Sequence, residues 1–151
     1  MGMRTTSTYN MDNIVGGLES TDHAILEQKL QRVPFSLLSK ADDNGFTLLH
    51  HAVLAGVKGK VGSMIMLAKA NGANNDHIKE WVNSRTSADA FTPLHLASFK
   101  GNMDAVRVLI DHGSDIFALN EFGLNMLHVA AQGDVAAPLY FFWEKGVDLN
   151  K

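Results

Sequence analysis

The sequence predicts an all-α solenoid of stacked antiparallel helix pairs with β-turn or loop tips, containing about three repeats and an N-terminal capping helix. Three observations predict this class. A six-residue pattern occurs three times, as TLLHHA at residues 47–52, TPLHLA at 92–97 and NMLHVA at 125–130. A turn-forming segment precedes each copy, and an apolar helical pattern follows it. Self-similarity with a period of roughly 20–50 residues is the sequence signature of repeats that stack side by side.

Each residue type in the central copy suits the start of a helix. Pro93 fits the first turn, because its missing N–H would have no partner there and its φ is already helical. The Thr92 hydroxyl can cap N–H groups that the first turn leaves free. Leu94 and Ala97 lie three residues apart and share one face, which we expect to be buried. The corresponding structural positions in the flanking copies include Thr47, Leu49 and Leu127.

The pattern TPLHxA is the signature of the ankyrin repeat, and the chain resembles that family over roughly residues 42 to 150. The step from His95 to His128 is 33 residues, the ankyrin period, whereas the step from His50 to His95 is 45 and implies an insertion of 12. The resemblance implies that these three histidines hydrogen-bond neighbouring backbone and join one repeat to the next. Their repeat spacing places them in successive layers, which favours a structural role over a shared metal site.

Composition narrows the class of protein further. The length of 151 residues predicts one compact domain, and an apolar share of 46% can supply its core. A net charge of −3 provides no basic surface for nucleic acid. No apolar run approaches the roughly 20 residues of a membrane span, and the first 20 residues lack the apolar core of a secretory signal. The absence of cysteine excludes disulfides within this chain and fits a cytoplasmic setting.

We expect an ankyrin repeat domain over residues 20–151, after a disordered segment at residues 1–19. The first residues also fit the loose N-myristoylation pattern MGxxxT, but a flexible start without lipidation is the favoured interpretation. Within the domain, the expected parts are a cap at 20–41, repeat one with its insertion at 42–86, repeat two at 87–119, and repeat three at 120–151.

The cap is expected to contain a helix that starts after the N-cap candidates at residues 20–22 and continues through about Gln31. Ile25, Leu26 and Leu30 form its modest apolar stripe, and Pro34 stops it. A solenoid needs such a cap because its terminal repeat would otherwise expose an apolar face.

Repeat one starts with the strong turn signal DDNG at residues 42–45. Its first helix is expected from Thr47 to Ala55 and ends at Gly56. The usual short link is stretched over residues 57–60, and the second helix ends near residues 71–72.

The insertion follows at residue 75 and extends to about Val82. Ile78, Trp81 and Val82 have the spacing i, i+3, i+4, which predicts a short helix packed on the side of the solenoid. Insertions of this kind often form part of a binding face. A structural spacer is the alternative.

Repeat two has the turn SADA at residues 87–90, where alanine replaces the usual glycine. Its first helix is expected from Pro93 to Lys100, and Asn102 caps the second helix. Apolar residues at 106–110 give that helix its core stripe, and it ends at residues 112–113.

Repeat three has its turn at residues 120–123 and its first helix from about Asn125 to Gln132. Pro138 falls in the first turn of the second helix. The run LYFFW at residues 139–143 surrounds that helix with large apolar side chains, so we expect both of its faces to be covered. The ending GVDLNK leads toward another turn and predicts further repeats or another domain in a longer protein.

The sequence contains no pattern typical of a catalytic centre. It lacks a nucleophile elbow, a glycine-rich phosphate loop, HExxH and Cys/His metal spacing. Asp42 and Asp43 are interpreted as turn residues rather than a metal or acid–base pair. We therefore expect a non-catalytic chain without cofactor or metal.

The first functional hypothesis is a protein–protein interaction module. Ankyrin stacks present a concave face made of turn tips and exposed positions of the first helices, and a partner protein would bind there. Phe91, Phe99 and Phe122 would form an aromatic ridge on it, unless these rings mainly pack on their neighbours. The candidate partner-binding residues are Asp43, Asn44, Phe46, Asp89, Phe91, Phe99, Lys100, Glu121, Phe122 and Gln132.

Two other hypotheses remain open. Residues 125–134 followed by 139–142 are similar to ankyrin segments of protist DHHC-type protein palmitoyltransferases. That resemblance implies a regulatory or substrate-recruiting domain at the cytoplasmic face of a membrane, with the cysteine-containing catalytic part beyond Lys151. The third hypothesis is a structural scaffold that spaces neighbouring domains and binds nothing on its concave face.

Overall fold

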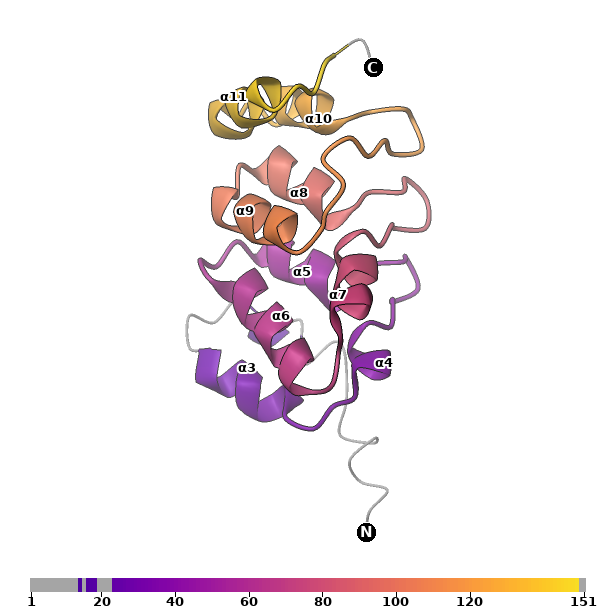
Figure 1. Ribbon diagram of the computed structural model, residues 1–151, viewed down its shortest axis with the longest axis vertical. Coiled ribbons are helices and arrows are strands. Elements are labelled where there is room, and N and C mark those ends of the chain that lie inside the picture. The colour runs from indigo at the N-terminus through magenta and orange to yellow at the C-terminus, as the bar shows by residue number, and fades with distance from the viewer. Residues whose placement is uncertain (1–13, 15, 19–22, 150–151) are drawn as a thin grey trace.

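The computed structural model describes residues 14, 16–18 and 23–149, and within them all regular secondary structure is helical (Figure 1). The predicted all-α class is confirmed. The helices in chain order are α3 (His23–Leu30), α4 (Phe35–Leu38), α5 (Leu48–Ala55), α6 (Lys60–Ala70), α7 (Asn75–Val82), α8 (Pro93–Lys100), α9 (Met103–Asp111), α10 (Met126–Gln132) and α11 (Ala136–Glu144).

The helices form two rows that follow the long axis of the molecule (Figure 1). The first row stacks α5 on α8 and α8 on α10, and the second stacks α6 on α9 and α9 on α11. Contacts of α5 with α6, α8 with α9 and α10 with α11 join the rows into three helix pairs. Turns connect each pair to the next and project on one side of the stack (Figure 1).

One hydrophobic core passes through all three pairs. Leu49, Leu94 and Leu127 occupy the same position in α5, α8 and α10, and all three are buried in this core. Each pair therefore shelters the apolar side of its neighbour, which a single helix pair could not do alone.

The first helix of every repeat begins with the same reciprocal cap. The side chains of Thr47, Thr92 and Asn125 accept a bond from the backbone N–H three residues later, where a histidine stands. That histidine's ring in turn accepts a bond from the N–H of the capping residue. Histidine thus takes the place that glutamate or glutamine has in a capping box. The recurring motif specifies three helix starts through this arrangement.

The N-terminal end differs in part from expectation. The predicted cap helix is present as α3 but ends at Leu30, and its proposed N-cap residues lie outside the described part. Ile14 and Leu18 are buried in the core, so the expectation of a disordered segment is wrong at these two residues. The possible myristoylation pattern lies outside the described residues.

The insertion forms the predicted helix α7. Ile78, Trp81 and Val82 are buried, and α7 contacts α6 beside the stack. Asn74 caps α7 in the same reciprocal way, with the ring of His77 as its partner.

Helix α11 contradicts the expectation that both of its faces are covered. Phe142 is fully buried, but Tyr140 and Trp143 are 64% and 67% exposed. Only the side of α11 that faces α9 and α10 is packed. The aromatic run therefore supplies the core from one face and leaves large rings on the other.

Gly133 ends α10 for a different reason from the glycines after α5 and α8. Gly56 and Gly101 adopt the left-handed conformation, with φ of 72° each, whereas Gly133 has φ −79°. A Cβ atom at Gly133 would collide with the carbonyl oxygen of Phe99 in the neighbouring repeat. Glycine is required here by the close approach of two backbones.

We predict that Gly133→Ala lowers the free energy of unfolding by about 1–3 kcal/mol, because backbone cannot give way as a flexible side chain would. The matched control is Gly62→Ala inside α6, where an added Cβ would meet only a methyl group of Val108 at 3.9 Å. The free energy of unfolding of that variant is expected to rise by up to about 1 kcal/mol. Equal effects of the two substitutions in urea unfolding would contradict the assignment.

Candidate interaction face

The turn before each first helix is closed by its own backbone and by a polar side chain. Asp42 and Asn120 each bond through backbone N–H to the carbonyl four residues later, at 2.9 and 3.0 Å. Their side-chain Oδ1 atoms accept two further backbone N–H groups. In repeat two, the Thr86 N–H donates to the Phe91 carbonyl, and the Thr86 hydroxyl accepts the Phe91 N–H. This turn is one residue longer than the other two. The tips are therefore held in defined conformations.

The tips are also bonded to one another. The Ser87 N–H donates to the Asn44 carbonyl at 3.0 Å, and the Glu121 N–H donates to the Asp89 carbonyl at 2.9 Å. Gly45 allows the first contact, because its φ is 81° and a Cβ there would collide with the Ser87 backbone. Three turns thus form one continuous row.

The motif histidines connect each repeat to the following turn. The Nε2 atoms of His50 and His95 lie 3.0 Å from the carbonyl oxygens of Phe91 and Leu124, respectively. His128 uses the carbonyl of Leu149, at 2.9 Å, in the tail of its own repeat. Because Nδ1 accepts the cap N–H, each neutral ring must carry its proton on Nε2 and donate it to the carbonyl.

Burial favours the neutral form of two of these rings, those of His50 and His95. Desolvation lowers the pKa of His50 to about 4, despite the bond to the Phe91 carbonyl, which acts in the opposite direction. Burial also lowers the pKa of His95. A protonated ring would present a second donor to the cap N–H, so the neutral form is the one that both bonds require.

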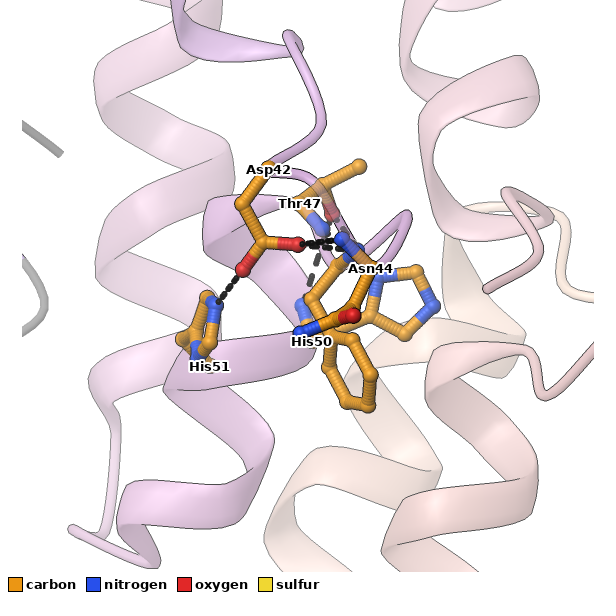
Figure 2. A network of polar contacts seen from close by, with 6 residues as sticks. Asp42, Asn44, Thr47, His50 and His51 are labelled. Atoms are coloured by element: carbon orange, nitrogen blue, oxygen red, sulfur yellow. Dashed lines mark hydrogen bonds and ion pairs between the residues drawn. The ribbon is translucent and has the colours of Figure 1, made fainter. Parts of the chain in front are cut away.

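A second histidine belongs to a smaller network on the surface of repeat one (Figure 2). His51 Nε2 lies 3.0 Å from Asp42 Oδ2, while Asp42 Oδ1 accepts the N–H groups of Asn44 and Phe46. Burial alone would raise the pKa of the Asp42 carboxyl, but the bonds from His51 and from the two backbone groups lower it. Sequence reasoning assigned Asp42 to the turn and missed His51.

The ten candidate partner-binding residues are placed on the turn tips and at the ends of the first helices, and this set is called the tip face below. Seven of its side chains are exposed, including those of Asp43, Asn44, Lys100, Glu121, Phe122 and Gln132. Phe99 is also exposed, and Phe46, Asp89 and Phe91 are half-buried.

The three phenylalanines of the expected aromatic ridge are not equivalent. Phe122 and Phe99 are 69% and 42% exposed, whereas Phe91 packs edge-on against the ring of His95, with centroids 5.9 Å apart. Phe46 similarly contacts the rings of His50 and His51. Two rings are therefore free to meet a partner, and two support the turns.

His51 is the tip-face neighbour that the motif analysis overlooked. It follows the motif histidine directly and is half-buried, as is Leu96 at the same position in repeat two. Adjacent histidines at residues 50 and 51 were the available signal, since successive helical residues point to different faces.

Two further findings concern other kinds of site. Among the described residues, no group of three or more His, Cys, Asp or Glu side chains is arranged to hold a metal ion. Within the same residues, no helix has the combined length and apolar character to cross a membrane.

Stacked helix pairs joined by hydrogen-bonded turns define a helical-repeat solenoid. Residues 64–151, more than half of the chain, match the family model for ankyrin repeats in three copies. The chain belongs to the ankyrin repeat family.

Two individual proteins illustrate this relationship. A 38-residue segment is 50% identical to ankyrin repeat domain-containing protein 49 of Bos taurus, covering 25% of this chain and 16% of that protein. The fold is similar to a chain in the crystal structure of the yeast ribosomal protein Rps3 in complex with its chaperone Yar1. The TM-score is 0.77 at 26% identity, covering 89% of this chain and 91% of that chain.

The buried histidines predict a specific dependence of stability on pH. The folded-state pKa of His50 lies below its unfolded value near 6.5. Its contribution to the free energy of unfolding is therefore complete above about pH 6.5 and is lost as the pH falls toward 4. We expect the free energy of unfolding to decrease by about 2–3 kcal/mol over this interval from His50. Urea unfolding at pH 7 and pH 4.5 measures the loss.

The control is His50→Gln, which has no group that titrates in this range. Its overall stability should be lower at pH 7, but its decrease between pH 7 and pH 4.5 should be smaller than that of the wild-type chain. Parallel pH profiles would show that His50 does not contribute in this way.

Proposed function

We propose that this chain is a non-catalytic protein-interaction module that binds a partner protein through the tip face. The observation that carries the proposal is the placement of exposed Phe99 and Phe122 on turns and helix ends that are held by partly buried hydrogen bonds. Exposed apolar rings on a rigid support are typical of binding surfaces.

Rigidity of the tips favours binding energetically. Asn120 fixes the turn that carries Phe122, and the Glu121–Asp89 backbone bond fixes that turn relative to repeat two. A partner would therefore lose little free energy in ordering this surface, because the loops are already held in one conformation.

The surrounding side chains suit a polar rim. Asp43, Glu121, Lys100 and Gln132 are exposed, and they carry charges of both signs or an amide. Hot-spot residues of interfaces are commonly aromatic and are surrounded by groups that exclude water. In this proposal Phe99 and Phe122 are the anchors, and the polar residues determine which partner fits.

The structural neighbour supports a protein as the partner class, because that structure is a complex between a ribosomal protein and its chaperone. Ankyrin repeat domains are generally non-catalytic, and we expect a cytoplasmic protein without cofactor. Fold similarity does not transfer the identity of a partner.

A regulatory domain of a larger DHHC-type palmitoyltransferase remains the alternative proposal. It rests on the resemblance of residues 125–134 and 139–142 alone, and this chain contains no cysteine for that chemistry. The full-length gene distinguishes the two, since a cysteine-rich DHHC segment and apolar 20-residue runs must follow if the alternative holds.

The double substitution Phe99→Ser and Phe122→Ser tests the tip face. We expect it to abolish capture of cross-linked partner proteins from an extract, because both anchors are lost. The free energy of unfolding should change by at most about 1 kcal/mol, because both sites are exposed. The matched control is Met66→Ser on α6, which removes a side chain that is 64% exposed in the second helix row.

Partners that remain bound to the double variant but are lost with Met66→Ser would place binding on the other side of the solenoid. A double variant that is folded and retains every partner would contradict the proposal.

A further inference from the structure

A cleft lies between the short helix α4 and the inserted helix α7, outside the tip face. Its volume is about 400 Å³, and its lining includes Phe35, Ser36, Asn71, His77, Glu80 and Trp81. Both helices lie on the side of the stack from which the turns project (Figure 1). The 12-residue insertion in repeat one supplies one wall, so a regular repeat would not form this cleft.

Aromatic rings make the apolar part of the cleft. Phe35 stacks on the ring of His77 with centroids 5.4 Å apart and an interplanar angle of 23°. Phe35 also meets Trp81 edge-on, at 5.4 Å and 87°. Phe35 is half-buried and His77 is exposed, so part of this aromatic surface is open to a ligand.

A buried donor lies in the same wall. Trp81 is 2% exposed, and its indole Nε1–H has no acceptor among the described residues. A buried N–H without a partner is unfavourable by about 1–3 kcal/mol. Because this N–H is buried, a ligand's acceptor would reach it only if the lining side chains moved apart, and would then remove this penalty.

The neighbouring polar groups add further donors, and the Glu80 carboxylate adds acceptors. His77 Nδ1 accepts the Asn74 N–H at 3.2 Å, so the neutral ring carries its proton on Nε2 and can donate it. The hydroxyl of Ser36 is exposed and adds another donor. The hydroxyl of Ser84 is already engaged, since it donates to the Trp81 carbonyl at 2.6 Å.

One charge completes the lining. Glu80 is exposed and is the formally charged side chain among the residues that line the cleft. A ligand that enters beside it would be favoured by a positive charge near the mouth.

From these features we propose that the cleft binds a proline-rich segment of a partner protein, in the polyproline II conformation, with a basic residue beside the prolines. Pyrrolidine rings pack on aromatic side chains, and a polyproline II segment leaves its carbonyl oxygens free to accept bonds. Proline contributes no backbone N–H, so few donors of such a segment would need an acceptor in the cleft. A helical segment fits less well, because its own backbone bonds occupy most of its carbonyls.

The direct test is a titration of the ¹⁵N-labelled chain with a peptide of eight prolines followed by two arginines, observed through indole N–H resonances. We expect the Trp81 signal to shift on binding, while Trp143, which is exposed on α11, serves as an internal control. No shift of the Trp81 signal at millimolar peptide, or equal shifts of both signals, would overturn the proposal.

Substitutions test the contacts separately by fluorescence anisotropy with the same labelled peptide. Trp81→Phe keeps an aromatic ring and removes the N–H, so we expect about tenfold weaker binding, whereas Trp143→Phe should bind as the wild-type chain does. His77→Gln, at an exposed position, should also weaken binding, and Glu80→Gln should reduce the dependence of affinity on salt.

Two control peptides test whether the cleft binds a different kind of ligand. An amphipathic helical peptide of leucine and lysine, and a glycine–serine peptide ending in two arginines, should bind at least tenfold more weakly. Equal or tighter binding of either one assigns the cleft to a different ligand and overturns the proposal. Unchanged affinity of both folded variants, Trp81→Phe and His77→Gln, would do the same.

Discussion

The structure depends on one imidazole in each repeat, which uses both of its ring nitrogens. Nδ1 of His95 accepts the N–H of Thr92 and completes the cap of α8, while Nε2 donates to the Leu124 carbonyl in the following turn. The same ring thereby starts a helix and attaches the next repeat. Protonation would destroy the first of these bonds, and burial prevents it by lowering the histidine pKa.

This link explains why the surface turns are held in fixed positions. His50 donates to the Phe91 carbonyl, and the Thr86 hydroxyl accepts the Phe91 N–H. Phe91 is therefore bonded both to a buried histidine and to the start of the turn. Turn-to-turn backbone bonds then place the tips in one row. The exposed rings are consequently presented by the core of the solenoid rather than by loose loops.

The motif predicted these parts of the fold because each of its residues has a local function. Helix starts at Thr47 and Thr92, the buried leucines and the inserted helix α7 follow from caps, spacing and periodicity, which are visible in the sequence. The tip-face residues could be placed on turns and helix ends by aligning the three copies of the motif. Their position in the repeat does not by itself identify a partner.

Other features depend on contacts between distant residues, which no local pattern records. The Gly133 requirement comes from the Phe99 carbonyl, and the exposure of Trp143 depends on which side of α11 meets its neighbours. The Asp42–His51 bond joins a turn to a helix nine residues later. The burial of Ile14 and Leu18 could not be predicted, because their segment contains glycines and shows no apolar period.

The imidazole ring nitrogens provide the most direct measurement of the central claim. Long-range ¹H–¹⁵N spectra at pH 7 should show His50 and His95 as neutral rings protonated at Nε2, and His50 should remain so at pH 5. Rings protonated at Nδ1, rapidly averaging tautomers, or a His50 that titrates near pH 6.5 would contradict the account.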